Sequence, residues 1–448
     1  MIKKIIYKLG FDKAIIYTSS TSILNALGSV MSVIFVVKFM SVVEQGYYYT
    51  FGSIVAIQIF FELGLNAIIT QYAAHENAHL NIDNSFKIEG PIYNKSRIAS
   101  LLQFSIKWYS IFSFFLLISL IIAGFIFFQK YNNATNVNWV IPWILLALGT
   151  SLNLLISPII AFLQGIGKIK ELASYQFIIQ LIRLLIVWVG LFFGLGLYIL
   201  GIGSICYFIL ITIIILFKYF KLLKNIFKIE ISDKIIYFKE IFPFQWKIAI
   251  SWISGYFIFQ LFNPVLFATE GPQVAGQMGL TLAALNGILS LSLAWINTKV
   301  PLFSNLIAKK KYTDLDFNFN LALKQSLGIN VFLLIFFVLI IILLNSLNIN
   351  INGKPLSARF LGFLPLFFMM IPIILNHLVA SWATYLRCHK KEPFLLNSIV
   401  SGILCTFSTL ILGNHFGVNG MTFGYMLICI LIFPWSYYIY FKKKQEWH

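Results

Sequence analysis

Long apolar runs separated by short polar connections follow one another along the whole chain. Each run holds about 20 residues or more, which is enough for a helix to cross a hydrocarbon core about 30 Å thick. We place twelve spans at 14–39, 47–72, 102–128, 140–163, 171–193, 196–217, 242–267, 275–299, 322–345, 360–386, 394–413 and 419–440. The pattern therefore predicts an all-α, polytopic membrane protein.

The composition excludes a soluble globular protein. Of the 448 residues, 59% are hydrophobic and only 11% are charged, whereas soluble proteins carry roughly 25% charged residues. The formal net charge is +18, but the charges form short clusters between the apolar runs. No basic stripe is interleaved with an aromatic face of the kind that reads nucleic acid. We therefore expect no nucleic-acid partner.

Lysine and arginine residues divide unequally between the two sides of the predicted membrane. Nearly all of them fall in one alternating set of connections, including the N-terminus, the region 218–247 and the run 442–444. The opposite connections hold only Lys38, Lys130, Lys354 and Arg359. Since cytoplasmic loops carry the excess of basic residues, both termini are predicted to be cytoplasmic.

The chain is predicted to consist of two bundles of six spans, 1–217 and 242–448, joined by a basic cytoplasmic linker at 218–241. This linker alternates apolar residues with lysine at helix-like spacing, which suits a helix lying on an anionic inner leaflet. Gly46 and Gly276, each next to a glutamine, stand near the start of the second span of each half. This correspondence suggests an internal duplication, the plan of many secondary transporters.

Two charged residues fall well inside spans of the first half, Glu62 and Arg183. A charge at bilayer depth is costly unless it faces protein or water. Two interpretations remain open. The two side chains form a buried ion pair that locks the first bundle, or Arg183 faces an aqueous cavity as an anion site while Glu62 orients it or carries a coupling cation.

Polar residues recur every three or four positions on one face of the first, seventh and eighth spans, and they include Asn25, Gln260 and Asn286. Such a face lines either a seam between helices or a water-filled cavity. Lys38, Lys247 and Lys299 stand at helix ends, where a lysine either extends to the interface or lines a cavity. Together with Arg183 and Glu62, these residues form the predicted substrate-binding set.

Motifs of catalysis are missing from the sequence, which has no Walker A, GxSxG or HExxH pattern. The segment HENAH (75–79) places two histidines at i and i+4, a spacing that suits a metal. No convincing acidic third ligand accompanies it, and a solvated cytoplasmic helix is the better interpretation. We therefore expect neither an enzyme nor a bound metal or cofactor.

Four stretches resemble the polysaccharide transporters of the multidrug/oligosaccharidyl-lipid/polysaccharide (MOP, MATE-like) exporter superfamily, the O-antigen and capsule flippases. They are VVKFMSVVEQGYY (36–48), FELGLNAIITQYAA (61–74), ISPIIAFLQGIGKIKELASYQF (156–177) and AGQMGLTLAALNGILSLSLAWINTKVPLFSNLIAKKK (275–311). The resemblance covers about a quarter of the chain. Lys38 departs from it, because the family often has arginine there, which is a better phosphate ligand than lysine.

The resemblance implies two six-helix bundles around a central cavity that opens alternately to each side. It implies an undecaprenyl-diphosphate-linked oligosaccharide as substrate, flipped from the inner to the outer leaflet of a bacterial cytoplasmic membrane, with Arg183 holding the diphosphate. Implied partners are membrane lipids, H⁺ or Na⁺ as coupling ion, and a polysaccharide polymerase with its assembly proteins.

Other functions remain open at this point. A cation-coupled multidrug exporter of the same superfamily would favour acidic residues in the cavity, and Glu62 is the clear candidate. A membrane-embedded sugar-repeat polymerase would need a large outer loop with Arg or His, whereas the predicted outer loops are short. An assembly protein without transport activity would not need charges inside the membrane.

Overall fold

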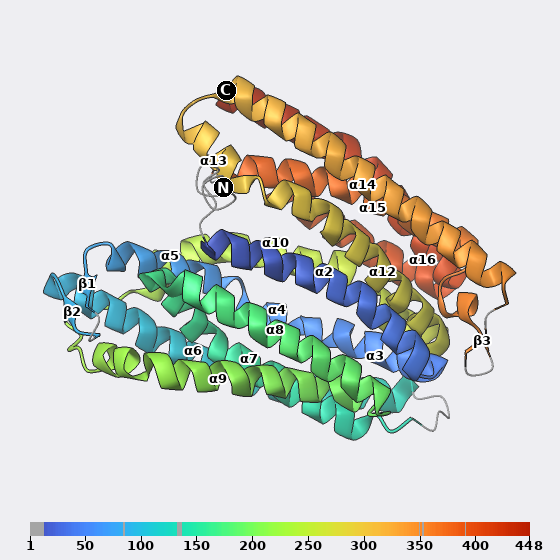
Figure 1. The fold of residues 1–448 in the computed structure, drawn as a ribbon, viewed down its shortest axis with the longest axis horizontal. Coiled ribbons are helices and arrows are strands. Elements are labelled where there is room, and N and C mark those ends of the chain that lie inside the picture. The colour runs from blue at the N-terminus through green and yellow to red at the C-terminus, as the bar shows by residue number, and fades with distance from the viewer. Residues whose placement is uncertain (1–12, 84–85, 132–136, 349, 352–353, 390) are drawn as a thin grey trace, which may run out of the picture.

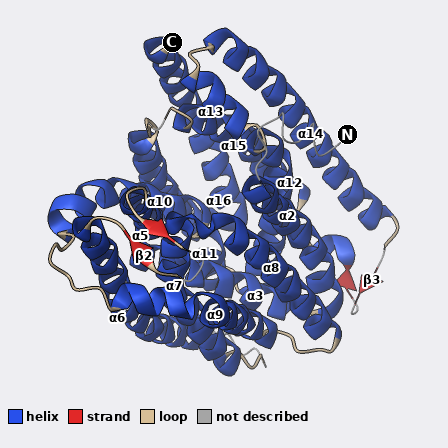
Figure 2. Cartoon of the chain, turned by 60° about the vertical axis from the view of Figure 1, so that its left-hand side comes forward, coloured by secondary structure: helices blue, strands red, loops and turns tan. Residues whose placement is uncertain are grey.

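The computed structural model describes residues 13–448 except 84–85, 132–136, 349, 352–353 and 390. The described chain is nearly all helix (Figure 2), with two short antiparallel hairpins, β1 (Asn81–Ile82) with β2 (Ile88–Glu89) and β3 (Asn350–Ile351) with β4 (Lys354–Pro355). Within the described residues, eight helices are long and apolar enough to cross a membrane, and a ninth span results if one bent helix pair is counted.

The first half contains α2 (Lys13–Phe39), α3 (Val42–Val55), the single turn η1 (Ala56–Gln58), α4 (Ile59–Glu62), α5 (Leu65–Asn77), α6 (Ile92–Tyr131), α7 (Val140–Leu163), α8 (Ile169–Phe192) and α9 (Tyr198–Phe227). The second half contains η3 (Tyr237–Ile241), α10 (Phe242–Phe259), α11 (Phe262–Thr269), α12 (Pro272–Asn297), α13 (Val300–Ala308), α14 (Tyr312–Ser346), η4 (Leu356–Arg359), α15 (Phe363–Arg387) and α16 (Leu395–Trp447).

Glycines with left-handed backbone divide two of the long helical stretches. The stretches Val140–Phe192 and Leu395–Trp447 hold 53 residues each, which is about 80 Å of helix at 1.5 Å per residue. The first is broken at Gly167 (φ 89°) between α7 and α8, and the second at Gly417 (φ 58°) inside α16. Because the hydrocarbon core is only about 30 Å thick, each stretch is long enough for two crossings.

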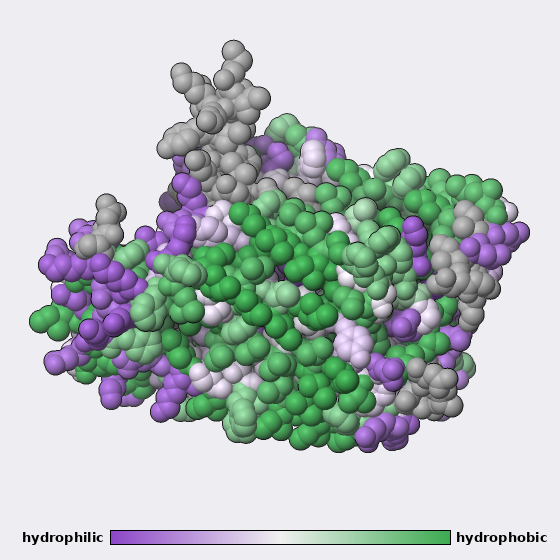
Figure 3. Space-filling model, turned by 60° about the horizontal axis from the view of Figure 1, so that its bottom comes forward, coloured by the Kyte–Doolittle hydropathy of each residue, from purple (hydrophilic) through white to green (hydrophobic). Residues whose placement is uncertain are grey.

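Apolar side chains cover the outside of the molecule between two polar ends. Figure 3 shows a broad hydrophobic belt flanked by hydrophilic residues. Large apolar side chains of the spans are open to the surroundings, such as Phe114, Phe332 and Leu431, which are 61%, 66% and 66% exposed. Exposed apolar area of this extent is stable in lipid but not in water, so the protein is a multi-pass membrane protein.

The two halves meet closely at one end of the molecule, where α3 packs against α11 and α12. At the opposite end, where α2 begins and α16 ends, helices α13 to α16 diverge from the first half (Figure 1). Helix α10 is the exception, because it stays beside α4 and α5, with Tyr256 against Phe60 and Ile248 against Gly64. The charge pattern of the sequence predicts that the closed end faces the outside, and we name it the outer closure after this prediction.

The basic linker differs from its prediction. The sequence pattern predicts a separate surface helix over 218–241, but α9 continues without a break to Phe227. Its extension stays helical because Tyr219, Leu222 and Ile226 are buried against the first half. The linker is thereby shortened to 228–241, an irregular segment that ends in η3.

Candidate transport site

Arg183 lines a cavity of about 680 Å³ inside the first half. Gln176, Gln180 and Arg183 follow one another at helical spacing on α8, so they share one face. The cavity is lined by α2, α3, η1, α7, α8 and α9, and by Ala283 of α12 from the second half. Its polar lining also includes Ser29, Ser32, Tyr48, Tyr49, Gln58, Thr150, Asn153, Ser204 and Tyr207. Among the described residues that line it there is no carboxylate.

The guanidinium of Arg183 is incompletely satisfied. Its Nε is buried and has no hydrogen-bond partner among the described residues. Leaving a buried donor unpaired costs about 1–3 kcal/mol, and more for a charged group. An anion that enters the cavity would remove this cost, and this property makes the cavity a candidate site.

Glu62 lies where the second span is broken. Helix α4 ends at Glu62, and Leu63 (φ 49°) and Gly64 (φ 68°) are both left-handed before α5 begins. The two parts of the span meet at an angle of 41°. Broken helices at membrane depth occur where the backbone is buried in protein or lines a cavity, and they hold substrate and ion sites in many transporters.

The structure does not bring Glu62 and Arg183 together as an ion pair. The carboxylate of Glu62 instead accepts a hydrogen bond from Asn66 Nδ2 at 2.8 Å, and none of the ion pairs of the described residues joins it to Arg183. The ion pair that one interpretation of the sequence required is therefore absent from this conformation.

Another, smaller cavity adjoins both the Arg183 cavity and Asn66, the hydrogen-bond partner of Glu62. This cavity of about 320 Å³ is lined by Asn66, Ser157, Gln164 and Gln176, and it shares Asn153 and Tyr207 with the Arg183 cavity. Asn66 thus contacts Glu62 on one side and this smaller cavity on the other.

The three lysines of the predicted set lie away from the Arg183 cavity. Lys38 is exposed at the end of α2 with its Nζ 5.3 Å from the ring centre of Phe39. Lys247 is exposed on α10 with its Nζ 5.7 Å from the ring centre of Trp246. Lys299 is half-buried in the break between α12 and α13. None of the three lines the cavity.

The predicted amides are dispersed as well. Asn286 is exposed on α12 and does not line the Arg183 cavity. Gln260, at the C-terminal end of α10, lines a different cavity in the second half. Asn25 belongs to α2, but its side chain lies outside the described residues. Of the predicted residues whose side chains the structure describes, only Arg183 lines the first cavity, together with neutral residues such as Asn153 and Tyr207 that sequence reasoning missed.

Arg359 is a second buried arginine, and sequence reasoning used it only to define the outer side. It is 1% exposed and lies in the outer closure. Its Nη1 donates to the carbonyl oxygen of Met40 at 2.8 Å and to Gln45 Oε1 at 3.4 Å. Gln45 Nε2 donates to the carbonyl oxygen of Gly276 at 2.7 Å. Burial lowers the pKa of the Arg359 guanidinium, and these bonds join the two halves.

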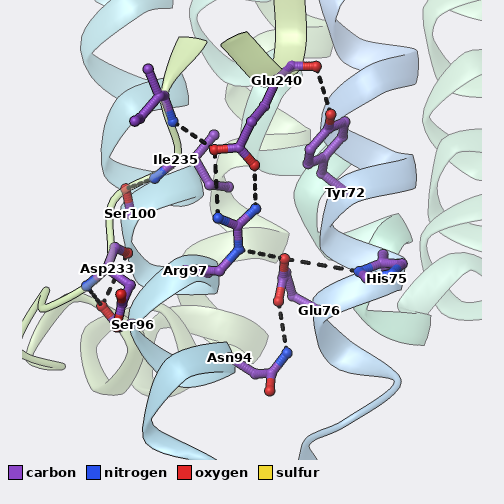
Figure 4. Close-up of polar contacts among 11 residues, drawn as sticks. Tyr72, His75, Glu76, Asn94, Ser96, Arg97, Ser100, Asp233, Ile235 and Glu240 are labelled. Carbon is purple, nitrogen blue, oxygen red and sulfur yellow. Dashed lines mark hydrogen bonds and ion pairs between the residues drawn. The ribbon is translucent and has the colours of Figure 1, made fainter.

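The other end of the first half holds a cluster that ties down the linker (Figure 4). Arg97 on α6 donates to Glu240 Oε2 at 2.5 Å through Nη2 and to Glu76 Oε1 at 2.8 Å through Nε. Tyr72 donates to the carbonyl oxygen of Glu240 at 2.7 Å, and Ser96 accepts from the backbone N–H of Asp233 at 2.8 Å. We call these contacts the linker clamp.

The HENAH motif (75–79) lies next to the linker clamp. His75 Nδ1 lies 3.9 Å from Glu76 Oε1, and His79 follows just after the C-terminal end of α5. The described residues contain no group of three His, Cys, Asp or Glu side chains placed to hold a metal ion.

Loss of the clamp is expected to loosen the linker. Hydrogen bonds to charged groups contribute about 1.5–3 kcal/mol, so Arg97→Met should speed tryptic cleavage after Lys234 and Lys239 roughly tenfold. Lys107→Met, an exposed position of the same helix, should not. Equal cleavage in the two variants would contradict the clamp.

The clamp should also respond to acid. The hydrogen bond from Arg97 lowers the pKa of Glu240 below its usual value of 4.5. A carboxyl whose pKa is lowered by folding stabilises the folded state at a pH above its ordinary pKa. This contribution is lost as the pH falls through the lowered pKa of the folded state. Cleavage by an acid protease should therefore rise below about pH 4.5 in the native protein and change less in Arg97→Met.

Known proteins resemble this chain in fold but not in sequence. No family model matches the chain, and no curated protein matches its sequence. Solved structures do match. A structure of the MATE multidrug transporter DinF-BH superposes with a TM-score of 0.59 at 15% identity, over 97% of this chain and 96% of that one.

Two further structures match as well. A multidrug resistance MATE family transporter of the MOP superfamily in an inward-facing conformation gives a TM-score of 0.58 at 12% identity, over 95% of this chain and 96% of that one. The lipid II flippase MurJ in an inward closed conformation gives 0.56 at 15% identity, over 96% of this chain and 90% of that one. The chain has a MATE-like fold. At these identities the likeness concerns the fold and not the substrate.

Proposed function

We propose that this protein is a flippase that moves an undecaprenyl-diphosphate-linked oligosaccharide from the inner to the outer leaflet of the bacterial cytoplasmic membrane. The repeat unit would belong to O-antigen, capsule or exopolysaccharide. The observation that carries the proposal is the Arg183 guanidinium, which lines an internal cavity without a carboxylate beside it. A diphosphate is the part of such a substrate that needs a cation.

The arrangement of the halves suits alternating access. The outer closure is held by bonds of Arg359 and Gln45, while α13 to α16 diverge from the first half at the other end (Figure 1). A substrate would enter from the inner leaflet, bind near Arg183, and leave after the outer closure separates. Polymerase and assembly proteins would then take up the product at the outer face.

A cation-coupled multidrug exporter is the second candidate, because two of the matching structures are multidrug transporters. Its cationic substrates would be repelled by Arg183, and the described lining of the cavity offers no carboxylate to bind them. The charge of the cavity therefore favours an anionic substrate.

Transport in reconstituted vesicles separates the two candidates. We expect a fluorescent polyprenyl-diphosphate sugar to change leaflets in the presence of the protein, and a lipophilic cationic dye to stay where it was added. An inside-negative potential should speed outward movement, because each charge gains about 2.3 kcal/mol per 100 mV. Accumulation of the dye without movement of the lipid would instead identify an exporter.

We place the coupling ion, a proton or sodium, at Glu62. An unpaired carboxylate at the helix break would oppose movement of the empty carrier, and a bound cation would neutralise it. In the same vesicles, Glu62→Gln should keep movement of the lipid but lose its dependence on the ion gradient. Unchanged gradient dependence in this variant would remove Glu62 from the coupling mechanism.

We also propose twelve spans with both termini in the cytoplasm. The left-handed breaks at Gly167 and Gly417 each permit the chain to reverse, and α2 and the bent pair α3–α5 supply the first two spans. Single cysteines at positions 270 and 350 should react with an impermeant maleimide in intact cells, and cysteines at 90, 225 and 310 should not. Labelling at 225 would contradict this topology.

A further inference from the structure

A second cavity, of about 520 Å³, lies in the second half between α10, α15 and α16. Its lining is largely apolar, with side chains such as Leu375, Ile428 and Ile432, and it also presents aromatic rings, amides and hydroxyls, among them Trp252, Gln260 and Ser251. The one charged residue in the described lining is Arg387, whose Nε and Nη2 donate to Glu392 at 2.7 and 3.1 Å. Because that charge is neutralised, the described lining offers polar groups on largely apolar walls and carries no net charge.

The two cavities occupy corresponding places in the two halves. The Arg183 cavity is lined by the first, fourth, fifth and sixth long segments of the first half, α2, α7, α8 and α9, together with α3. The second cavity is lined by the corresponding segments of the second half, which are α10, α15 and the two parts of α16. The halves therefore repeat one pocket, and only the copy in the first half carries an arginine without an acidic partner among the described residues.

A single turn of the second span separates the two cavities. Val55 and Gln58 line the Arg183 cavity, whereas Ala56 and Ile59 line the second cavity. These positions belong to η1 and its immediate neighbours. A helix is about 10–12 Å across with its side chains, so one ligand of that length can reach both cavities around this turn.

The chemistry of the second cavity suits an uncharged sugar. Aromatic rings offer apolar faces with polar edges, and amide and hydroxyl groups donate to and accept from ring hydroxyls. Ser251 and Gln260 make no side-chain hydrogen bond to any other described residue, so both are available to a ligand. An isoprenoid chain would leave these groups without a hydrogen-bond partner, at a cost, and a phosphate would find only Arg387, whose charge Glu392 already neutralises.

We propose that the second cavity is a subsite for the neutral sugar part of the substrate, while Arg183 binds its diphosphate. This inference rests on the proposed function and adds to it a division of the ligand between the two halves. Trp252, which is 38% exposed, provides the stacking face, and Tyr256, which is 8% exposed, contributes to the wall of the cavity. Gln260 provides a hydrogen-bonding amide, which gives this predicted site residue a role different from that of Arg183.

The test compares two farnesyl diphosphate diesters, one esterified with methanol and the other with glucose, so that both carry two negative charges. Both probes would be titrated against the full-length protein in lipid nanodiscs, which avoid detergents with sugar head groups. We expect the glucosylated probe to bind about tenfold more tightly, as a stacking contact and one or two hydrogen bonds would provide.

Variants separate the two subsites. Gln260→Leu removes no side-chain hydrogen bond within the described protein. Combined with Trp252→Leu, it should reduce the tenfold preference to nearly one while leaving the affinity for the methyl probe unchanged. Trp246→Leu, on the same helix but outside both cavities, is the matched control. Arg183→Met should lower the affinity for both probes by the same factor.

The outcomes distinguish this inference from the proposed function. Equal binding of both probes, or a sugar preference that survives Gln260→Leu and Trp252→Leu, would overturn the sugar subsite while the flippase proposal stands. If the native protein binds neither probe, or if Arg183→Met binds both as tightly as the native protein does, the diphosphate site is absent and both proposals fall.

Discussion

Arg183→Met is expected to lower the rate of lipid-linked glycan translocation roughly 10- to 100-fold. Methionine keeps much of the apolar stem but removes the charge and all donors. Hydrogen bonds to a charged partner contribute about 1.5–3 kcal/mol, and each 1.4 kcal/mol is a factor of ten. The measurement is the initial rate of leaflet exchange in reconstituted vesicles, scaled to the amount of folded protein.

Two further variants test whether Arg183 acts on the substrate or on the fold. Arg183→Lys keeps the charge but loses the fork that matches a phosphate, so we expect a rate between those of the native protein and Arg183→Met. The double variant Arg183→Glu with Glu62→Arg should stay inactive, because the structure shows no ion pair between these residues. Full recovery of transport in the double variant would refute the anion site.

Gly46→Ala is expected to keep the outer closure from forming. A Cβ atom at this position would lie 1.9 Å from the carbonyl oxygen of Pro272, which is backbone and cannot rotate away. Gly276 makes the reciprocal approach, since its Cβ would lie 2.9 Å from the backbone nitrogen of Gly46. Overpacking costs about 1–3 kcal/mol, which would shift the equilibrium toward the outward-open state roughly 5- to 150-fold.

Accessibility of Ser53 reports on this shift. Its hydroxyl accepts a hydrogen bond from Asn263 Nδ2 at 3.0 Å across the closure, and the residue is 5% exposed. With the four native cysteines replaced, Ser53→Cys should react with an impermeant maleimide in the Gly46→Ala protein much faster than in the parent. Gly52→Ala is the control, because a Cβ there meets no atom within 4 Å. Equal reactivity in both alanine variants would refute a closure limited by Gly46.

The fold class and the depth of the charged residues could be read from the sequence. Lipid excludes water, so every spanning backbone must satisfy its own hydrogen bonds, and an apolar run of about 20 residues can do little else than form a helix. This local rule indicated a helical membrane protein and placed Arg183 and Glu62 inside spans. The glycine pair Gly46 and Gly276 was also visible, although the sequence did not reveal that the two meet across the closure.

The composition of the site depended on the tertiary structure. A sequence gives the depth of a residue along its helix but not which neighbouring helix it faces, because crossing angles and rotations arise from packing over the whole bundle. Arg183 therefore faces Tyr207 and Asn153 rather than Glu62, whose helix ends at two left-handed residues. The buried position of Arg359 has the same cause, since its partners at Met40 and Gln45 lie more than 300 residues away in the chain and only folding brings them to it.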